Sequence, residues 1–209
     1  MTTPPPIVLY PGGRMKSRSR PVVALPNVSG EDLRPALAAA SEGAGIPLVL
    51  ALACAIAESG LDPRAERWGG SEGTRQAREA IAAGDSSRLR EIIDRAWPDI
   101  SFGYGQRIVR FHYAGDHSPS VPNVLAVRRQ VFEDPEADLR EMATLLSSTL
   151  GRARRGDLSP CGGDEILGAL IVYNAGHLPA PDAPWWDEHP VNLANYRRAL
   201  ERARSLLTL

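Results

Sequence analysis

The continuous apolar run at residues 46–60, IPLVLALACAIAESG, restricts the fold more than any other segment of the chain. Pro47 suits the first turn of a helix, and Gly60 can adopt the left-handed conformation that commonly closes one. Between them the residues are apolar on nearly every face as far as Glu58. A helix with this pattern is buried on all sides rather than laid on a surface, so the sequence predicts a core helix.

Glu58 stands in the last turn of this predicted helix. Its ionised form is disfavoured by the apolar surroundings and by the partial negative charge at the carbonyl end of a helix, so we expect a raised pKa. A carboxylic acid that stays protonated near neutral pH is what a general acid in glycoside cleavage needs. The alternative is that Glu58 simply reaches solvent where the helix ends, as most charged residues do.

The composition is that of a soluble globular protein, with 43% apolar and 23% charged residues in a chain of 209. The net charge of -1 favours neither a nucleic acid nor an anionic membrane as a partner. No apolar run of about 18 residues could span a membrane, and the N-terminus lacks the basic-then-apolar order of a signal peptide. Four scattered histidines argue against a zinc site, and no cofactor is expected. Whether Cys54 and Cys161 pair is left open.

The remaining pattern predicts a mainly helical chain without strands. Residues 1–28, rich in proline and basic residues, indicate an extended or disordered arm. Residues 61–70 read as a loop, in which Trp68 either stacks on a sugar ring or anchors the loop by packing. Apolar residues at helical spacing predict further helices over about 29–43, over 73–97 as two helices with a turn at Gly84-Asp85, over 134–151 and 164–176, and from about 191 onward.

Residues 99–106, DISFGYGQ, cannot form a regular helix, because Pro98 precedes them and Gly103 and Gly105 allow close backbone approach. Two aromatic residues between small ones, followed by the amide of Gln106, are suited to the wall of a site for a polar ligand with apolar faces, such as an N-acetyl sugar. Residues 107–113 and His117 could line the same groove, although a lone loop histidine is more often merely exposed.

The predicted helix at 164–176 resembles the first one, because it is apolar through Val172 and ends in polar residues and a glycine. Two buried helices that both finish in polar groups predict one site between their ends. The following loop carries Trp185 and Trp186, which either stack on carbohydrate or pin the loop onto the core.

Three segments in this order resemble the lysozyme-like lytic transglycosylases of the soluble (SLT) type, which are related to goose-type lysozyme. GIPLVLALACAIAESGLDPRA matches the family's apolar helix with its ESG turn, SFGYGQ at 101–106 is similar to its GLMQ segment, and ALIVYNAG at 169–176 looks like its AYNAG signature. The resemblance covers roughly residues 33–204. It implies a mainly α, lysozyme-like domain at 29–209, with a helical insertion at about 70–98 and the N-terminal arm at 1–28.

The resemblance also implies roles for single residues. Glu58 would be the one general acid and base, Ser59 would help to position it, and Gln106 would line the sugar groove. Tyr173 and Asn174 would lie opposite the glutamate and hold it or the substrate. The implied substrate is the β-1,4 bond between N-acetylmuramic acid and N-acetylglucosamine in peptidoglycan, cleaved without water to give 1,6-anhydro products.

The chain departs from the family pattern where Tyr104 and Gly105 replace the leucine and methionine of GLMQ, which alters the groove wall that Tyr104 would form. Asp99 is either a turn residue beside Pro98 or a second carboxylate, which would permit an inverting hydrolase. The alternatives are therefore a peptidoglycan hydrolase and a non-catalytic structural or wall-binding module.

The expected partner is the glycan strand, with no nucleic acid and no membrane insertion. Without a signal peptide, the chain would fit a phage lysin released by a holin or carried in the virion.

Overall fold

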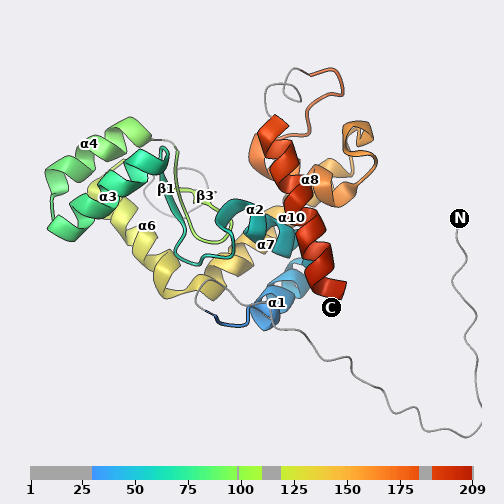
Figure 1. Ribbon diagram of the computed structural model, residues 1–209, viewed down its shortest axis with the longest axis horizontal. Helices are drawn as coiled ribbons and strands as arrows, with labels where there is room; N and C mark the ends of the chain where they lie inside the picture. Colours follow the sequence, from blue (N-terminus) through green and yellow to red (C-terminus); the bar gives the residue numbers. More distant parts are fainter. Residues whose placement is uncertain (1–29, 98, 110–118, 184–189, 209) are drawn as a thin grey trace, which may run out of the picture.

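The computed structural model describes residues 30–97, 99–109, 119–183 and 190–208. The predicted arm at 1–28, His117 and the pair Trp185-Trp186 lie outside the described residues. The described part of the chain is mainly helical, as predicted (Figure 1). Its elements are α1 (Arg34–Ala44), α2 (Leu48–Ser59), β1 (Glu66–Trp68), α3 (Ser71–Ala83), α4 (Ser86–Ala96), β2 (Ile100–Phe102), β3 (Arg107–Ile108), α6 (Val121–Glu133), α7 (Pro135–Ala153), the 3-10 turn η1 (Ser159–Cys161), α8 (Glu165–Ala175) and α10 (Pro190–Thr208).

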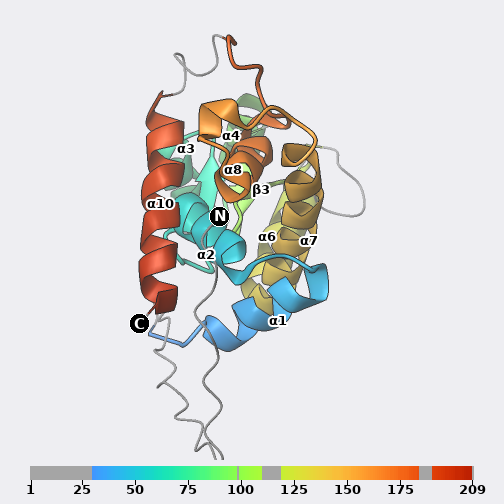
Figure 2. The same cartoon turned by 90° about the vertical axis from the view of Figure 1, so that its right-hand side faces the viewer.

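Helix α2 lies at the centre of the larger of two hydrophobic clusters, as its sequence predicts. Pro47 precedes its first turn, Gly60 closes it in the left-handed conformation, and the side chains from Leu50 to Ala55 are fully buried. Helices α1, α7, α8 and α10 all contact α2. Figure 2 shows α10 on one side and α7 on the other, with α2 and α8 between them. This packing fixes the position of Glu58 at the end of α2.

Helix α10, which the sequence predicts from about residue 191, packs along α2 with Tyr196, Leu200 and Ala203 buried. Cys54 and Cys161 are both buried in the same cluster and are not joined by a disulfide. Within the described ranges no single helix is long and apolar enough to cross a membrane. Helices α1 and α2 together meet the length and composition criteria, but they are bent by 119° relative to each other.

A small antiparallel sheet shows that the prediction of a strand-free chain is wrong. Strand β2 pairs with β1, placing Ile100 opposite Trp68, and with β3, placing Ser101 opposite Ile108. Each strand has two or three residues, which is too short for an alternating pattern to be visible in the sequence. The predicted loop at 61–70 therefore includes a strand, and the DISFGYGQ segment forms a β-hairpin with the residues that follow it.

The second hydrophobic cluster joins the sheet to α3, α4 and α6. Trp68 is 1% exposed and meets Phe102 edge to face, with 5.5 Å between the ring centroids. Of its two predicted roles, Trp68 therefore has the packing role. Helices α3 and α4 form the predicted pair, with Gly84 in the left-handed conformation between them. Helix α6 was not predicted, although Val121, Val124, Leu125, Val131 and Phe132 recur at the spacing of an amphipathic helix.

Helix α1 differs from the prediction at both of its ends. Helix α1 begins at Arg34 rather than near residue 29, and its N-cap residue Leu33 has no capping side chain, but Oδ1 of Asp32 accepts a hydrogen bond from the Arg34 N–H at 3.0 Å. It also continues through Gly43, and Gly45 ends it in the left-handed conformation. Helix α8 begins as predicted, because the Asp164 carboxylate accepts hydrogen bonds from the backbone N–H groups of Ile166 and Leu167.

Candidate active site

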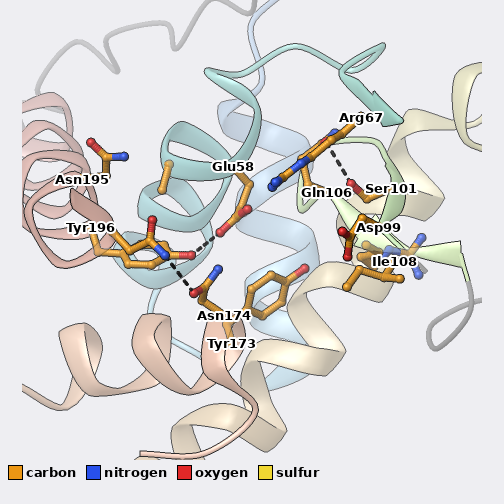
Figure 3. A pocket seen from close by; sticks show the side chains of 13 residues that line it. Glu58, Arg67, Asp99, Ser101, Gln106, Ile108, Tyr173, Asn174, Asn195 and Tyr196 are labelled. Carbon is orange, nitrogen blue, oxygen red and sulfur yellow. Dashed lines mark hydrogen bonds between the residues drawn. The ribbon is translucent and has the colours of Figure 1, made fainter. Parts of the chain in front are cut away.

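A polar pocket of about 420 Å³ lies where the two clusters meet, and its volume is typical of a small-molecule site. The end of α2, strand β1, the β2–β3 hairpin, the end of α8 and the beginning of α10 all contribute to it (Figure 3). The two buried helices predicted to end at one site, α2 and α8, both end there. The lining residues are Ala57, Glu58, Arg67, Asp99, Ser101, Gln106, Arg107, Ile108, Tyr173, Asn174, Asn192, Asn195 and Tyr196.

Glu58 projects from the last turn of α2 into this pocket, and Tyr196 of α10 donates a hydrogen bond to its Oε1 atom. Loss of solvent around the carboxyl group raises the pKa of Glu58, as predicted. The hydrogen bond from Tyr196 and the positive charge of Arg67 both act in the opposite direction, but the desolvation effect is larger. The group is thus biased toward the protonated form, while two neighbours are placed to stabilise the carboxylate once it forms.

The β2–β3 hairpin presents Gln106 to the pocket in a fixed orientation. Its Nε2 atom donates to the carbonyl oxygen of Gly103 at 3.1 Å, and its Oε1 atom accepts from the hydroxyl of Ser101 at 3.1 Å. Gln106 has a φ of 45°, a left-handed conformation that is uncommon for a residue other than glycine. The amide is therefore held by its own turn, and a ligand would meet it already oriented.

A buried carboxylate on α7 attaches this hairpin to the core. Asp138 is 2% exposed and accepts a hydrogen bond from the backbone N–H of Tyr104 at 2.7 Å. The same carboxylate forms an ion pair with Arg107, which is 4% exposed, through contacts of 2.6 and 3.0 Å. Because both charges are paired and hydrogen-bonded, the pair can persist in the interior. This ion pair connects the turn that carries Gln106 to helix α7.

The end of α8 contributes Tyr173 and Asn174. The hydroxyl of Tyr173 donates to the carbonyl oxygen of Gly105 at 2.8 Å, so it supports the hairpin rather than Glu58. Asn174 accepts a hydrogen bond from the side chain of Asn192 at 3.4 Å. Four amide side chains line the pocket, and amides both donate to and accept from sugar hydroxyl and acetamido groups. They are Gln106, Asn174, Asn192 and Asn195.

The structure brings five of the seven predicted site residues into one pocket, namely Glu58, Asp99, Gln106, Tyr173 and Asn174. Asp99 is exposed there, beside the first residue of β2. Ser59 does not line the pocket, since its hydroxyl donates to the Ala55 carbonyl one turn back at 2.8 Å.

Tyr104 does not line the pocket either, because its side chain is 1% exposed and packs in the larger hydrophobic cluster. The predicted aromatic wall is therefore wrong: Phe102 and Tyr104 both point into the interior. The cause is the β-hairpin, whose turn directs these rings toward the core and leaves only Gln106 of the turn facing the pocket.

Sequence reasoning missed Tyr196 and Arg67 as site residues. Tyr196 lies among the apolar residues of the predicted last helix, and only its position close after Asn192 and Asn195 could have suggested a polar role. Arg67 lies on a strand that was not predicted, so nothing in the sequence pointed its side chain toward Glu58. In the described ranges no group of three or more His, Cys, Asp or Glu side chains is arranged to hold a metal ion.

No protein-family model, curated protein or solved structure matches the chain.

Proposed function

We propose that this chain is a lytic transglycosylase that cleaves the β-1,4 bond between N-acetylmuramic acid and N-acetylglucosamine in peptidoglycan. One observation carries the proposal: Glu58, with its raised pKa, faces a pocket lined by amides and held between rigid elements. A lysozyme-like arrangement of the helices, with α3 and α4 as an insertion, is part of the same proposal. It rests on the ESG, SFGYGQ and YNAG segments, which contribute Glu58, Gln106, Tyr173 and Asn174 to one site.

The first step needs a proton donor, and the protonated form of Glu58 is available because burial disfavours the carboxylate. Glu58 gives its proton to the glycosidic oxygen as the bond from that oxygen to C1 of the muramyl residue breaks. The N-acetylglucosamine part leaves as an alcohol, and Glu58 becomes a carboxylate. The Tyr196 hydroxyl and the Arg67 charge stabilise this carboxylate, since both favour the ionised form.

The second step needs a base, and the same carboxylate can supply it. Glu58 accepts the proton of the muramyl 6-hydroxyl while the oxygen of that group bonds to C1. The product is a 1,6-anhydromuramyl end, no water is consumed, and Glu58 returns to its protonated form. One carboxyl group suffices, which agrees with a pocket whose other described carboxylate, Asp99, is exposed.

A peptidoglycan hydrolase is the second candidate, because Asp99 lines the same pocket as Glu58. In that reaction Asp99 would act as a base on a water molecule at C1, and the product would carry a reducing end. The transglycosylase leaves a 1,6-anhydro end and the hydrolase leaves a reducing end, so one experiment separates the two candidates.

The experiment is mass spectrometry of the fragments released from purified peptidoglycan by the native protein, by Glu58→Gln and by Asp99→Asn. We expect anhydro-muropeptides from the native protein and from Asp99→Asn, and none from Glu58→Gln. Reducing-end fragments that disappear in Asp99→Asn would establish the hydrolase instead. No fragments from folded native protein, across walls of different chemistry, would leave a non-catalytic wall-binding module.

A further inference from the structure

Arg67 differs from Arg107, the other described arginine that lines the pocket, because no ion pair joins it to a carboxylate. Within the described part of the chain, neither a hydrogen bond nor an ion pair joins its guanidinium to another protein group. Arg107 is paired with Asp138, whereas Arg67 is exposed and reaches from β1 into the pocket toward Glu58 (Figure 3). Asp99 lines the same pocket without forming an ion pair with Arg67.

Arg67 also lies at the junction of the pocket with a second groove. This groove, of about 690 Å³, runs between β1 and α3 and includes Gly70, Ser71 and Thr74 in its lining. The two other arginines that line it are already paired. Arg75 contacts Glu72 and Glu79, and Arg78 contacts Glu66 at 2.6 Å. Of the described arginines that line the groove, Arg67 is therefore the one that is free to bind a ligand. A ligand long enough to pass from the pocket into the groove would contact it.

The charges around the pocket indicate what Arg67 would bind. When Glu58 is protonated it carries no charge, and Asp138 balances Arg107, so Arg67 and the exposed Asp99 carry the remaining charges of the pocket. Arg67 then provides a positive charge between the two hollows, and a guanidinium has the planar fork that suits a carboxylate. A neutral glycan would leave this group without a charged partner.

We propose that Arg67 selects glycan strands that carry carboxylates, by forming a charge-assisted hydrogen bond to a carboxylate next to the bond held at Glu58. The inference rests on the proposed function and deepens it by assigning a specificity residue. Two parts of peptidoglycan supply this chemistry. In a strand without peptides the lactyl group of each muramyl residue ends in a free carboxylate, whereas in a peptide-bearing strand that group is an amide and the carboxylates belong to the stem.

The test is isothermal titration calorimetry on the full chain in the Glu58→Gln background, which keeps a neutral side chain at the site and prevents turnover. Three tetrasaccharides of equal length serve as ligands: (GlcNAc-MurNAc)2 without peptides, the same glycan with its stems, and chitotetraose, which has no carboxylate. At low ionic strength we expect a carboxylate-bearing ligand to bind roughly tenfold more tightly than chitotetraose. Adding Arg67→Gln should remove this preference, and Arg67→Glu should reverse it.

Arg64→Gln is the matched control, because Arg64 is exposed three residues away and lines neither hollow. It should leave the preference unchanged. An effect of Arg67→Gln on the peptide-free glycan identifies the lactyl carboxylate, and an effect confined to the stem-bearing glycan identifies the peptide. Equal affinity for charged and neutral glycans, or a preference that survives Arg67→Gln, would overturn the inference and leave the proposed function standing. Binding of none of the three would overturn the proposed function, and this inference with it.

Discussion

The hydroxyl of Tyr196 in α10 donates a hydrogen bond to Oε1 of Glu58 in α2, across 138 residues of sequence. This bond acts on the carboxyl group in two ways. It restricts the side chain to one orientation toward the pocket, and it favours the ionised form against the desolvation that raises the pKa of Glu58. Tyr196 is itself 4% exposed, so its position is fixed by the packing of α10 against α2.

Tyr196→Phe should therefore change both the rate and its dependence on pH. Without the hydroxyl, the pKa of Glu58 rises further, so the proton donor persists to higher pH and the alkaline limb of the profile of kcat/KM moves upward. Loss of the fixed orientation should lower kcat by about 10- to 100-fold. The measurement is anhydro-product formation from peptidoglycan as a function of pH.

Tyr173→Phe is the control for that variant, because it removes a hydroxyl from the same pocket but one that bonds to Gly105 rather than to Glu58. Its alkaline limb should coincide with that of the native protein. An unshifted limb in Tyr196→Phe, or an equal shift in both variants, would contradict the role assigned to Tyr196.

Glu58→Gln should abolish activity and stabilise the fold in a manner that depends on pH. The pKa of Glu58 is higher in the folded state than in the unfolded state, where it is about 4.3, so the folded state binds more protons between these two values. The native protein therefore loses stability as pH rises through this window, from the unfolded to the folded pKa. Glutamine does not titrate, and its Oε1 atom can still accept the hydrogen bond from Tyr196. The variant should match the native protein below the window and melt at a higher temperature above it.

Thermal melts of both proteins at pH 4 and pH 8 measure this difference. Each pKa unit that separates the folded and unfolded states corresponds to about 1.4 kcal/mol at the high-pH end. If the difference in Tm between the two proteins is the same at both pH values, Glu58 does not carry a raised pKa.

The sequence predicts those features of the site that depend on neighbouring residues. The apolar run before Glu58 and the closing Gly60 were enough to place a desolvated carboxyl group at the end of a core helix. Asp164 and Gly176 likewise delimit α8, and so place Tyr173 and Asn174 at its end. In each case the signal is a cap or an uninterrupted apolar stretch, and both act within a few residues of the helix end.

Features that depend on distant residues could not be predicted in this way. Strands β1 and β2 pair residues 66–68 with 100–102, and neither strand is long enough to show a period of two. The direction of Tyr104 follows from that pairing, which explains why the predicted aromatic wall is buried. The hydrogen bond between Tyr196 and Glu58 depends on how α10 packs on α2, and no local pattern in the sequence of either helix predicts it.

Asp138→Asn should destabilise the protein strongly, although the change is nearly isosteric. It removes the close buried partner of Arg107 and leaves the exposed Glu141, at 3.9 Å, as its remaining ion-pair partner, and breaking a buried pair in this way typically costs about 3–5 kcal/mol. Chemical denaturation monitored by circular dichroism measures the free energy of unfolding. Glu72→Gln breaks an ion pair too, but on the exposed surface of α3, and should change stability very little. If the two variants lose comparable free energy of unfolding, the ion pair between Asp138 and Arg107 does not hold the hairpin to α7.

Gly103→Ala should have the same effect from the other side of that contact. Gly103 has a φ of +83°, and a Cβ atom there would lie 2.1 Å from Oδ2 of Asp138 and 2.8 Å from Val131. The added methyl group must displace the carboxylate that binds Tyr104 N–H and Arg107, so it should destabilise the fold by more than about 1 kcal/mol.

Gly43→Ala is the matched control, because Gly43 lies inside α1 with nothing within 4 Å of the new atom. Alanine is the better helix former, so this control should gain about 0.5–1 kcal/mol. Denaturation midpoints that shift in opposite directions for the two variants would support the tight contact between Gly103 and Asp138, and a Gly103→Ala protein as stable as the native one would exclude it.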